Sequence, residues 1–527
     1  MDILVRPRSV RPRLAAVCGT AVLGLVLAAC GSADAETEST EPPIPHQKFI
    51  SRPDLQPPEF EFTQGPAWSE EYAESEQYFF LTVDYDTATP SSAAMILDAS
   101  GELVWMDPSK RHVNDHGHFD LRPQQHDDET ILTYFKGPAA LGYGYGDFFL
   151  ANDTYQVFNV VTTGGSIPAH ETDFHDAVIT EDGTMLILAY HRKPADLTEL
   201  GGPEDGWVHD GVIQEVDIAT GEVVFEWSAL DHIPLTDGLL DFGQEAAADA
   251  ESDEPELGTF DNAWDYFHIN SATLDDDGGI LTSARHTNAV YKIDRDSGDV
   301  EWILGGTSSD FELDDDAVFA WQHTAARDTD GTITLFDNHA RNADDDKSSR
   351  GLRLELDEEA MTASVVTEYL PPAERPAGSM ANTQPLDNGN MFIGWGQQPY
   401  FSEFTREGEL IYDVCHGDAC HEGTGGGGGS YRAYKGTWEG HPTTNPAVVV
   451  QQSSQGEDHV YVSWNGATEV TQWRLVTGQN AQSATQAAVV AKTGFETAIP
   501  LETSTDYLAV EALDAEGEVL GTGTPTP

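Results

Sequence analysis

Four short stretches of this chain place histidine or arginine where a predicted strand begins or ends. They are DFHDAVITEDG with His175, DYFHINS with His268 and Asn270, SARHTN with Arg285, and WQHTAARD with His323. An imidazole can act as a nucleophile or exchange protons near neutral pH, and a guanidinium can hold an oxyanion. If these strand ends converge, they form a cationic, hydrogen-bonding pocket that suits an anion such as sulfate or phosphate.

Each of these residues also has a simpler interpretation. A single histidine at a strand end is often a hydrogen-bonded turn residue, and Arg285 could pair with one of the many aspartates. Three histidines could also hold a metal ion. Arg285 argues against a metal, because a guanidinium and a metal cation repel each other. The chain has no glycine-rich phosphate loop, so we expect no nucleotide donor and no cofactor.

The stretch from Asp265 to Gly306 indicates which elements position these groups. Two turn signals, DDDGG and DRDSG, enclose the segment ILTSARHTNAVYKID, in which apolar and polar residues alternate. This alternation is the period of a half-buried strand, so the stretch predicts two or three short strands.

Similar turn–strand–turn–strand units recur along the chain. They lie at about 76–107, 128–165, 183–230, 279–306, 331–370 and 389–415. Strand units that repeat every ~40 residues, with no helical period between them, are typical of a β-propeller, in which equivalent strand ends meet in a central channel. The sequence therefore predicts an all-β protein with a six-bladed β-propeller. An array of β-sandwiches is the alternative, and it is less favoured because sandwiches rarely repeat internally.

The residues after the predicted propeller form a different module. Beyond a glycine-rich loop, Tyr431–Pro446 is expected to lead out of the propeller. Seven short strand patterns follow in 447–527, which predicts a small β-sandwich like a fibronectin type III domain. The expected organisation is a signal peptide at 1–29, a disordered tether at 30–60, the propeller at 61–446 and the sandwich at 447–527.

The N-terminus resembles an export signal. Arginines precede the apolar run LAAVCGTAVLGLVLAAC, whose end resembles a bacterial lipobox. This predicts that Cys30 is lipidated and anchors the exported protein to the outer face of the cell membrane. The alternatives are an ordinary signal peptide or an anchor that is not cleaved. No paired arginine is present, so twin-arginine export is not expected.

The net charge is −65, from 26 basic and 91 acidic residues. Such a charge repels nucleic acid and anionic membrane surfaces, so neither is an expected partner. The acidic residues lie in many short clusters, which favours a protein that is soluble in high salt, where charges are screened. Calcium binding is the rival explanation, although no run has the full spacing of a calcium loop.

Besides Cys18 in the predicted signal peptide and Cys30 at the predicted lipidation site, the chain has two cysteines, Cys415 and Cys420, in VCHGDACHEG. An exported protein meets an oxidising compartment, so a small-loop disulfide between them is expected. A zinc site with the neighbouring histidines is the alternative, but the spacing does not match the common zinc patterns.

Five segments together resemble one known family. They are FHINSATLDDDGGILTSARHTNAVYKIDRDSGDVEWILGG, WQHTAARDTDGTITLFDN, SSRGLRLELD, LDNGNMFIGWG and SYRAYKGTWEGHP. In this order, from about Phe79 to Pro446, they are similar to the arylsulfotransferases, the PAPS-independent aryl sulfate sulfotransferases. The chain departs from the family's pattern after Asn338, where His339 replaces the usual glycine.

The resemblance implies a six-bladed propeller whose central channel transfers a sulfuryl group from a phenolic sulfate ester to a phenol through a sulfohistidine. It assigns the nucleophile to His323 and sulfate binding to His268, Asn270 and Arg285, with His175 as a further channel histidine. The alternative function is a cell-surface propeller without catalytic activity that binds an anionic or glycan ligand. The sequence predicts no particular oligomeric state, donor or acceptor, and it leaves open whether the acidic insert near 245–256 covers the channel.

Overall fold

The structure is a computed structural model that describes residues 47–73, 76–83, 93–107, 117–140, 142–249, 255–339, 348–420, 429–452, 457–502 and 505–525. The predicted signal peptide and Cys30 lie outside these residues. In the described part the chain is nearly all strand and loop, with short helices α1 (Glu70–Ala73), α3 (Ala229–His232) and α4 (Phe242–Asp249). Among these residues, no helix is long and apolar enough to cross a membrane.

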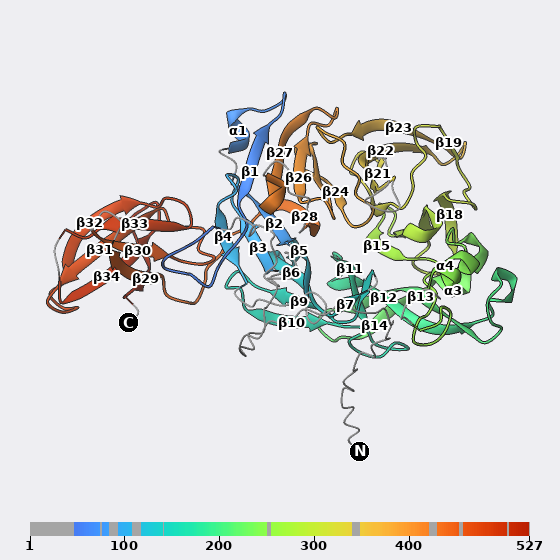
Figure 1. The fold of residues 1–527 in the computed structure, drawn as a ribbon, viewed down its shortest axis with the longest axis horizontal. Helices are drawn as coiled ribbons and strands as arrows, with labels where there is room; N and C mark the ends of the chain where they lie inside the picture. The colour runs from blue at the N-terminus through green and yellow to red at the C-terminus, as the bar shows by residue number, and fades with distance from the viewer. Residues whose placement is uncertain are drawn as a thin grey trace, which may run out of the picture. The chain divides into compact units, whose positions relative to one another are not determined.

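Within the described residues, six antiparallel sheets of four or five strands follow one another before residue 438 (Figure 1). The first sheet consists of β28 (Ser430–Thr437), β2 (Gln77–Val83), β3 (Ala93–Leu97) and β4 (Leu103–Met106). The second consists of β5 (Gly117–His126), β6 (Glu129–Gly137), β9 (Asp147–Ala151) and β10 (Val157–Val161). The third consists of β11 (Thr172–Ile179), β12 (Thr184–Ala195), β13 (Gly206–Asp217) and β14 (Val223–Ser228). A separate small hairpin joins β7 (Ala139–Ala140) and β8 (Tyr143–Gly144).

The other three sheets have the same order. The fourth consists of β15 (Ile269–Leu274), β16 (Ile280–Ala284), β17 (Ala289–Ile293) and β18 (Val300–Gly305). The fifth consists of β20 (His323–Arg327), β21 (Ile333–Asp337), β22 (Arg350–Asp357) and β23 (Thr362–Tyr369), with β19 (Glu312–Leu313) parallel to β23. The sixth consists of β24 (Asn382–Pro385), β25 (Met391–Gly394), β26 (Tyr400–Phe404) and β27 (Leu410–His416), with β1 (Phe60–Gln64) at its edge. The stretch from Asp265 to Gly306 thus holds four strands, where the sequence predicted two or three.

The first strands of the six sheets contact one another in a closed cycle. In order around the cycle they are β28, β5, β11, β15, β20 and β24. Each unit predicted from the sequence lacked this first strand and began with the second. The first strands are hard to recognise because polar residues and register shifts interrupt their alternation.

The cycle is closed by β28, which comes last in the chain among the six first strands. Residues 431–446 were expected to lead out of the repeats, but β28 pairs antiparallel with β2 and supplies the first strand of the first sheet. At the N-terminal end, β1 pairs with β27 of the last sheet. Both pairings cover strand edges that would otherwise expose unpaired backbone groups. The packed chain also begins before residue 60, the expected end of the tether, because Leu55 is fully buried.

The turns between the first and second strands of four sheets explain the repeated glycines. Gly183, Gly278, Gly331 and Gly389 have φ values of 75°, 87°, 88° and 86°, in the left-handed region that favours glycine. His339 takes the same conformation, with φ 56°. This conformation favours glycine, which agrees with the glycine that the family resemblance implies after Asn338.

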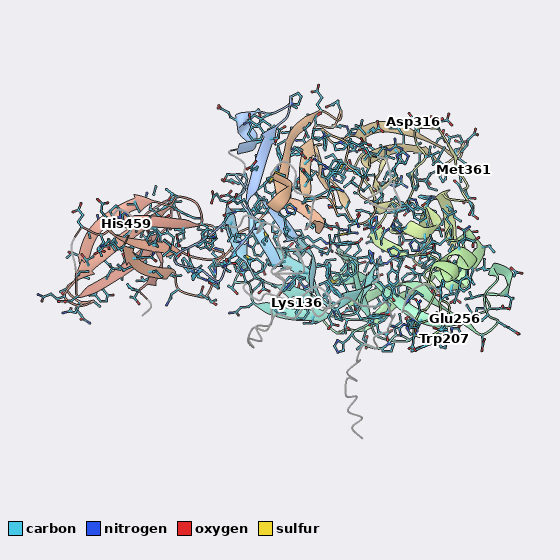
Figure 2. The ribbon with its side chains drawn as sticks, in the orientation of Figure 1. Lys136, Trp207, Glu256, Asp316, Met361 and His459 are labelled. Carbon is cyan, nitrogen blue, oxygen red and sulfur yellow. A yellow bond between two sulfur atoms is a disulfide. The ribbon has the colours of Figure 1, made fainter. Side chains whose placement is uncertain are left out.

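The seven strands predicted in the C-terminal region are all present. One sheet contains β29 (Ala447–Gln452), β30 (Asp458–Ser463) and β33 (Glu496–Pro500), and the other contains β31 (Gln472–Gly478), β32 (Thr485–Ala491), β34 (Tyr507–Leu513) and β35 (Val519–Gly523). Residues of both sheets, among them Val460 and Trp473, pack in one buried cluster. His459, labelled in Figure 2, lies on β30.

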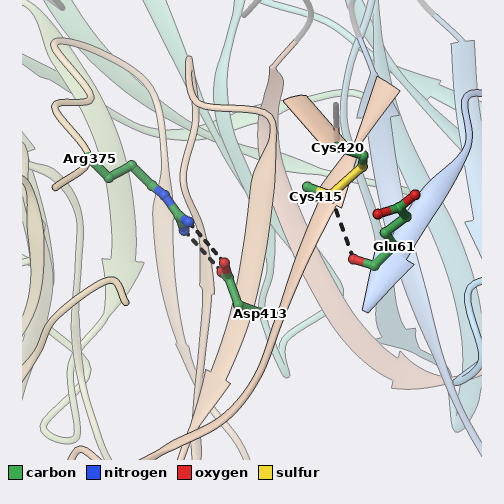
Figure 3. The surroundings of a disulfide bond; sticks show 5 residues. All are labelled: Glu61, Arg375, Asp413, Cys415 and Cys420. Carbon is green, nitrogen blue, oxygen red and sulfur yellow. Dashed lines mark hydrogen bonds and ion pairs between the residues drawn. A yellow bond between two sulfur atoms is a disulfide. The ribbon is translucent and has the colours of Figure 1, made fainter. Parts of the chain in front are cut away.

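The predicted disulfide between Cys415 and Cys420 is confirmed (Figure 3). It ties the end of β27 to the 3₁₀ turn Gly417–Cys420, with 5.4 Å between the two Cα atoms. On the same strand, Asp413 accepts two hydrogen bonds from Arg375 at 3.0 and 2.9 Å. Covalent and ionic contacts thus hold the last strand of the sixth sheet.

A buried cluster of charges joins four of the six first strands. Asp176 on β11 accepts hydrogen bonds from Arg122 of β5 at 2.6 Å and from Arg432 of β28 at 2.9 Å. The guanidinium of Arg432 also donates to the carbonyl oxygen of Asn270 on β15, at 2.9 Å. Asp120 and Tyr434 complete the cluster with a 2.8 Å hydrogen bond. Because both arginines are nearly buried and each has carboxylate partners, the cluster is paired rather than an isolated charge.

We expect Arg432→Met to lower the free energy of unfolding by about 3–5 kcal/mol, because it leaves two buried carboxylates, Asp120 and Asp176, with Arg122 as their one remaining cationic partner in the cluster. Denaturant unfolding of the full chain measures this loss. The control is Arg406→Met, since the side chain of Arg406 is 44% exposed in its ion pair with Asp330. An exposed pair contributes about 0–1 kcal/mol, so equal losses in the two variants would contradict the prediction.

Candidate functional site

Four of the residues predicted for the site line one cavity of about 470 Å³: His175, His268, Arg285 and His323. His175 lies on β11, His268 directly before β15, Arg285 in the 3₁₀ turn Arg285–Thr287 after β16, and His323 at the start of β20. They come from three consecutive sheets, so only the closed cycle of first strands brings them together.

The backbone is irregular where it presents these side chains. Register shifts occur between Thr172 and Ala177, between Ile269 and Ser271, and between His323 and Ala325. Such bulges turn side chains away from the normal alternation of a strand and are common beside active sites. Several residues without the freedom of glycine also have positive φ values here: His268 at 54°, Trp321 at 58°, Thr324 at 54°, Met380 at 69° and Ala381 at 87°. Each costs about 1–3 kcal/mol, and this strain collects at the cavity.

His323 is held as a neutral imidazole of defined tautomer. Asn338 donates through its Nδ2 to two carbonyl oxygens, those of Ala377 and Met380, so its Oδ1 faces His323. This oxygen only accepts, so the Nδ1 of His323, 2.7 Å away, carries the proton. The Nε2 atom therefore has the lone pair, and it accepts a hydrogen bond from the amide of Met380 at 3.2 Å.

Burial and the charge of Arg285 lower the pKa of His323 well below its ordinary value. The side chain is 1% exposed, so the charged form loses nearly all of its hydration. A buried neutral imidazole with its Nε2 lone pair in a cavity can attack an electrophile without first losing a proton.

His175 and His268 share a second arrangement, in which a carboxylate binds the ring. The Nδ1 atom of His175 lies 2.5 Å from Asp173 Oδ2, and that of His268 lies 2.5 Å from Asp265 Oδ2. Each carboxylate also accepts a hydrogen bond from the backbone amide of its histidine, at 2.8 and 3.0 Å respectively. Nδ1 is thus the protonated nitrogen of each ring, which leaves Nε2 available to a ligand.

Arg285 is fixed through both ends of its guanidinium. Nη1 donates to His286 Nε2 at 2.9 Å, Nη2 donates to the carbonyl oxygen of Gly378 at 2.8 Å, and the group lies 5.1 Å from the ring centroid of Trp321. These contacts position a cation in the cavity of a protein whose net charge is −65.

Asn270, which the sequence predicted to bind substrate, does not line this cavity. It is fully buried, and its Nδ2 donates to the carbonyl oxygen of Gln322 at 2.8 Å. Gln322 in turn donates to Ser283, Ala284 and Ala289, each at 3.0 Å. Asn270 therefore supports the residue next to His323, and its contact with substrate stays a prediction.

Asp265, His268 and His286 are close enough to hold a metal ion, with possible ligand atoms within 4.8 Å of one another. Their hydrogen bonds oppose this use. Arg285 can only donate, so it occupies the Nε2 lone pair of His286, while the Nδ1 of that ring donates to the carbonyl oxygen of Asp265 at 2.7 Å. His286 thus has no free lone pair for a metal.

Sequence reasoning missed several cavity residues. The aromatic rings of Phe119, Phe174 and Tyr431 form one wall, with Phe119 and Phe174 stacked at 4.6 Å between centroids. Their apolar character is also typical of a core, so only their position reveals them. Leu240 and Glu245 line the cavity as well, which places part of the acidic insert at the site; its residues 250–254 lie outside the described chain.

The fold and the cavity define an all-β protein made of successive antiparallel sheets, with a histidine- and arginine-lined site suited to an anion. The model of the arylsulfotransferase (ASST) family matches residues 122–417, which include all four cavity residues named above. The chain therefore belongs to the arylsulfotransferase family, and this membership implies a transferase of the sulfotransferase type. A comparison with curated proteins gives no match.

Solved structures similar to this chain have low sequence identity. A protein of unknown function from Bacteroides caccae is 12% identical with a TM-score of 0.39, and the match covers 68% of this chain and 99% of that one. The periplasmic gluconolactonase of Pseudomonas aeruginosa is 11% identical with a TM-score of 0.35, over 80% and 99%. A virginiamycin B lyase from Staphylococcus aureus is 10% identical with a TM-score of 0.31, over 75% and 88%.

We expect Asn338→Asp to raise the pKa of His323 by about one or more, because a carboxylate beside Nδ1 stabilises the imidazolium. An NMR titration of the His323 ring in the variant and the wild type measures the change. An unchanged or lower pKa in the variant would show that Asn338 does not contact Nδ1 in solution.

Proposed function

We propose that this protein is an extracytoplasmic, PAPS-independent aryl sulfate sulfotransferase that moves a sulfuryl group from a phenolic sulfate ester to a phenol through a sulfohistidine at His323. The main support is the neutral, buried His323, whose Nε2 lone pair lies in the same cavity as the guanidinium of Arg285. The proposal includes a six-bladed propeller, formed by the six sheets, and a fibronectin type III-like sandwich after residue 446. It also includes export and a lipid anchor at Cys30, on the evidence of the N-terminal sequence.

In the first step, the hydrogen bond from the Met380 amide to Nε2 of His323 breaks, and the freed lone pair forms a bond to sulfur while the bond from sulfur to the phenolic oxygen breaks. The leaving phenoxide keeps the bonding electrons and takes a proton from an imidazolium, the role we give to His268. In the second step, neutral His268 removes the proton from the acceptor phenol, whose oxygen attacks the sulfuryl group and releases His323. When the sulfate donor enters the cavity, its negative charge favours protonation of His268.

The other cavity residues fit the remaining parts of the substrate. Arg285 is a fixed positive donor for the nonbridging sulfuryl oxygens, which are charged throughout the transfer. The wall of Phe119, Phe174 and Tyr431 offers an apolar surface for an aryl ring. His175, which has the same carboxylate contact as His268, would bind the sulfuryl group or the phenolic oxygen.

The test of this function is transfer from 4-nitrophenyl sulfate to phenol by the purified protein in high salt. We expect nitrophenol release that depends on the acceptor, and a loss of at least about 10³-fold in His323→Ala, because the nucleophile is removed. His170→Ala is the matched control, since the side chain of His170 is 74% exposed and does not line the cavity.

Donor without acceptor should add one sulfuryl group to the wild type, detectable by mass spectrometry on the peptide that contains His323. Equal activity of His323→Ala and wild type would refute the assigned nucleophile. An inert wild type, over a range of donors and acceptors, would favour the alternative of a propeller that only binds an anionic or glycan ligand.

The pH dependence follows from the lowered pKa of His323. A pKa well below 6.5 keeps the nucleophile neutral at pH 6.5 and above, and protonation removes it only at lower pH. Because 4-nitrophenolate is a good leaving group and needs little help from an acid, kcat/KM for 4-nitrophenyl sulfate should be constant above pH 6.5 and fall on acidification below it. A midpoint at or above pH 6.5 would contradict the neutral, buried state of His323.

A further inference from the structure

Asp265 contacts two different parts of the site through two different groups. Its side-chain carboxylate accepts hydrogen bonds from the backbone amide and the Nδ1 of His268, at 3.0 and 2.5 Å. Its main-chain carbonyl oxygen accepts from His286 Nδ1 at 2.7 Å. His286 then accepts from Arg285 through Nε2 at 2.9 Å, so one residue is connected to both His268 and Arg285.

The direction of each hydrogen bond is fixed by the chemistry of the groups. A guanidinium only donates and a carbonyl oxygen only accepts, so His286 must be neutral with its proton on Nδ1. Protonation of His286 would replace its bond to Arg285 with repulsion between two cations. His286 is only 7% exposed. Little room is therefore left for another group to replace it as an acceptor for Arg285.

We infer that Asp265 and His286 are positioning residues for sulfuryl transfer, with separable effects. The carboxylate of Asp265 orients His268 and stabilises its imidazolium, so that Nε2 can give a proton to the leaving phenoxide. His286 connects the Asp265 carbonyl oxygen to Arg285 and holds the guanidinium where the sulfuryl oxygens bind. This inference rests on the proposed function and adds the two residues that set its proton transfer and its anion binding.

The second carboxylate–histidine pair provides an internal comparison. Asp173 accepts from both the amide and the Nδ1 of His175 through one oxygen, Oδ2, whereas Asp265 uses Oδ1 for the amide and Oδ2 for Nδ1 of His268. The other oxygen of Asp173 accepts from the amide of Gly144 at 2.6 Å. The contacts of Asp173 therefore extend to β8 and not to Arg285. Both aspartates bind the amide and the Nδ1 of one histidine, and they differ in what else they connect.

The first experiment measures kcat/KM for a series of aryl sulfates whose phenols differ in acidity. This constant reports the half-reaction up to the sulfohistidine. In Asp265→Asn, an NH2 group that only donates replaces one of the two oxygens that accept from His268, so one N–H group of His268 loses its acceptor, and the negative charge is lost. We expect a loss of about 10²-fold for phenyl sulfate and less than about threefold for 4-nitrophenyl sulfate, because only the poor leaving group needs the proton.

The second experiment tests the His286 contact. His286→Leu removes the acceptor for Arg285, so it should lower kcat/KM by about tenfold or more for every donor, without changing the dependence on leaving group. His286→Gln can both accept from Arg285 and donate to the Asp265 carbonyl oxygen, and it should recover most of the activity. A structural defect in the fold would slow all variants alike, and circular dichroism checks for it.

Asp173→Asn is the matched control and should leave the leaving-group dependence as in the wild type. If it makes the dependence steeper and Asp265→Asn does not, the proton donor is His175 and the inference is wrong. It is also wrong if Asp265→Asn slows all donors equally, or if His286→Gln is as slow as His286→Leu.

A measurement without turnover separates this inference from the proposed function. ¹⁵N NMR of the imidazole rings should find the proton on Nδ1 in both His268 and His286 of the wild type. Asp265→Asn should change the tautomer or the pKa of His268 and keep the Nδ1 tautomer of His286, which the Asp265 carbonyl oxygen and Arg285 fix. If the wild type transfers no sulfuryl group but these tautomers are found, the proposed reaction fails while the hydrogen-bonded arrangement stands. If the Nδ1 tautomers are absent, the inference fails even in an active enzyme.

Discussion

The pairing of Asp176 with Arg122 and Arg432 is the interaction on which the rest of this site depends. These charges lie on first strands from three sheets, and Arg432 also reaches the backbone of a fourth. His175 and Tyr431, the residues directly before Asp176 and Arg432 in the chain, line the cavity. Because ion pairs in a low-dielectric interior require close geometry, the cluster sets the spacing of the strands that present the site.

The site itself depends on keeping several ionisable rings neutral in a confined space. Burial lowers the pKa of His268, His286 and His323, and the guanidinium of Arg285 adds to this effect. Each ring then has one protonated nitrogen that binds the protein and one lone pair. The lone pair of His286 is used for Arg285, whereas Nε2 of His268 is the atom at which we propose that a proton passes to and from the substrate, so similar side chains have different roles because their partners differ.

A protein with a net charge of −65 needs a special arrangement to bind an anion. Other cationic side chains, such as those of Lys292 and Arg350, form ion pairs with carboxylates. Arg285 donates to an imidazole and to a carbonyl oxygen, two neutral acceptors that fix its guanidinium at the cavity.

The sequence by itself determined the all-β class, the turn glycines, the seven C-terminal strands, the disulfide and the four cavity residues. These features are local, or they carry a family motif, so periodicity, turn chemistry and residue type are enough to find them. Only the tertiary structure decided what depends on distant segments meeting: the pairing of β28 with β2, the place of Asn270 behind His323, and the contacts of Asp265, His286 and Asn338. A hydrogen bond between residues such as His323 and Met380 leaves no periodic signal in the chain, because its partners are brought together by the closure of the sheets and not by their spacing.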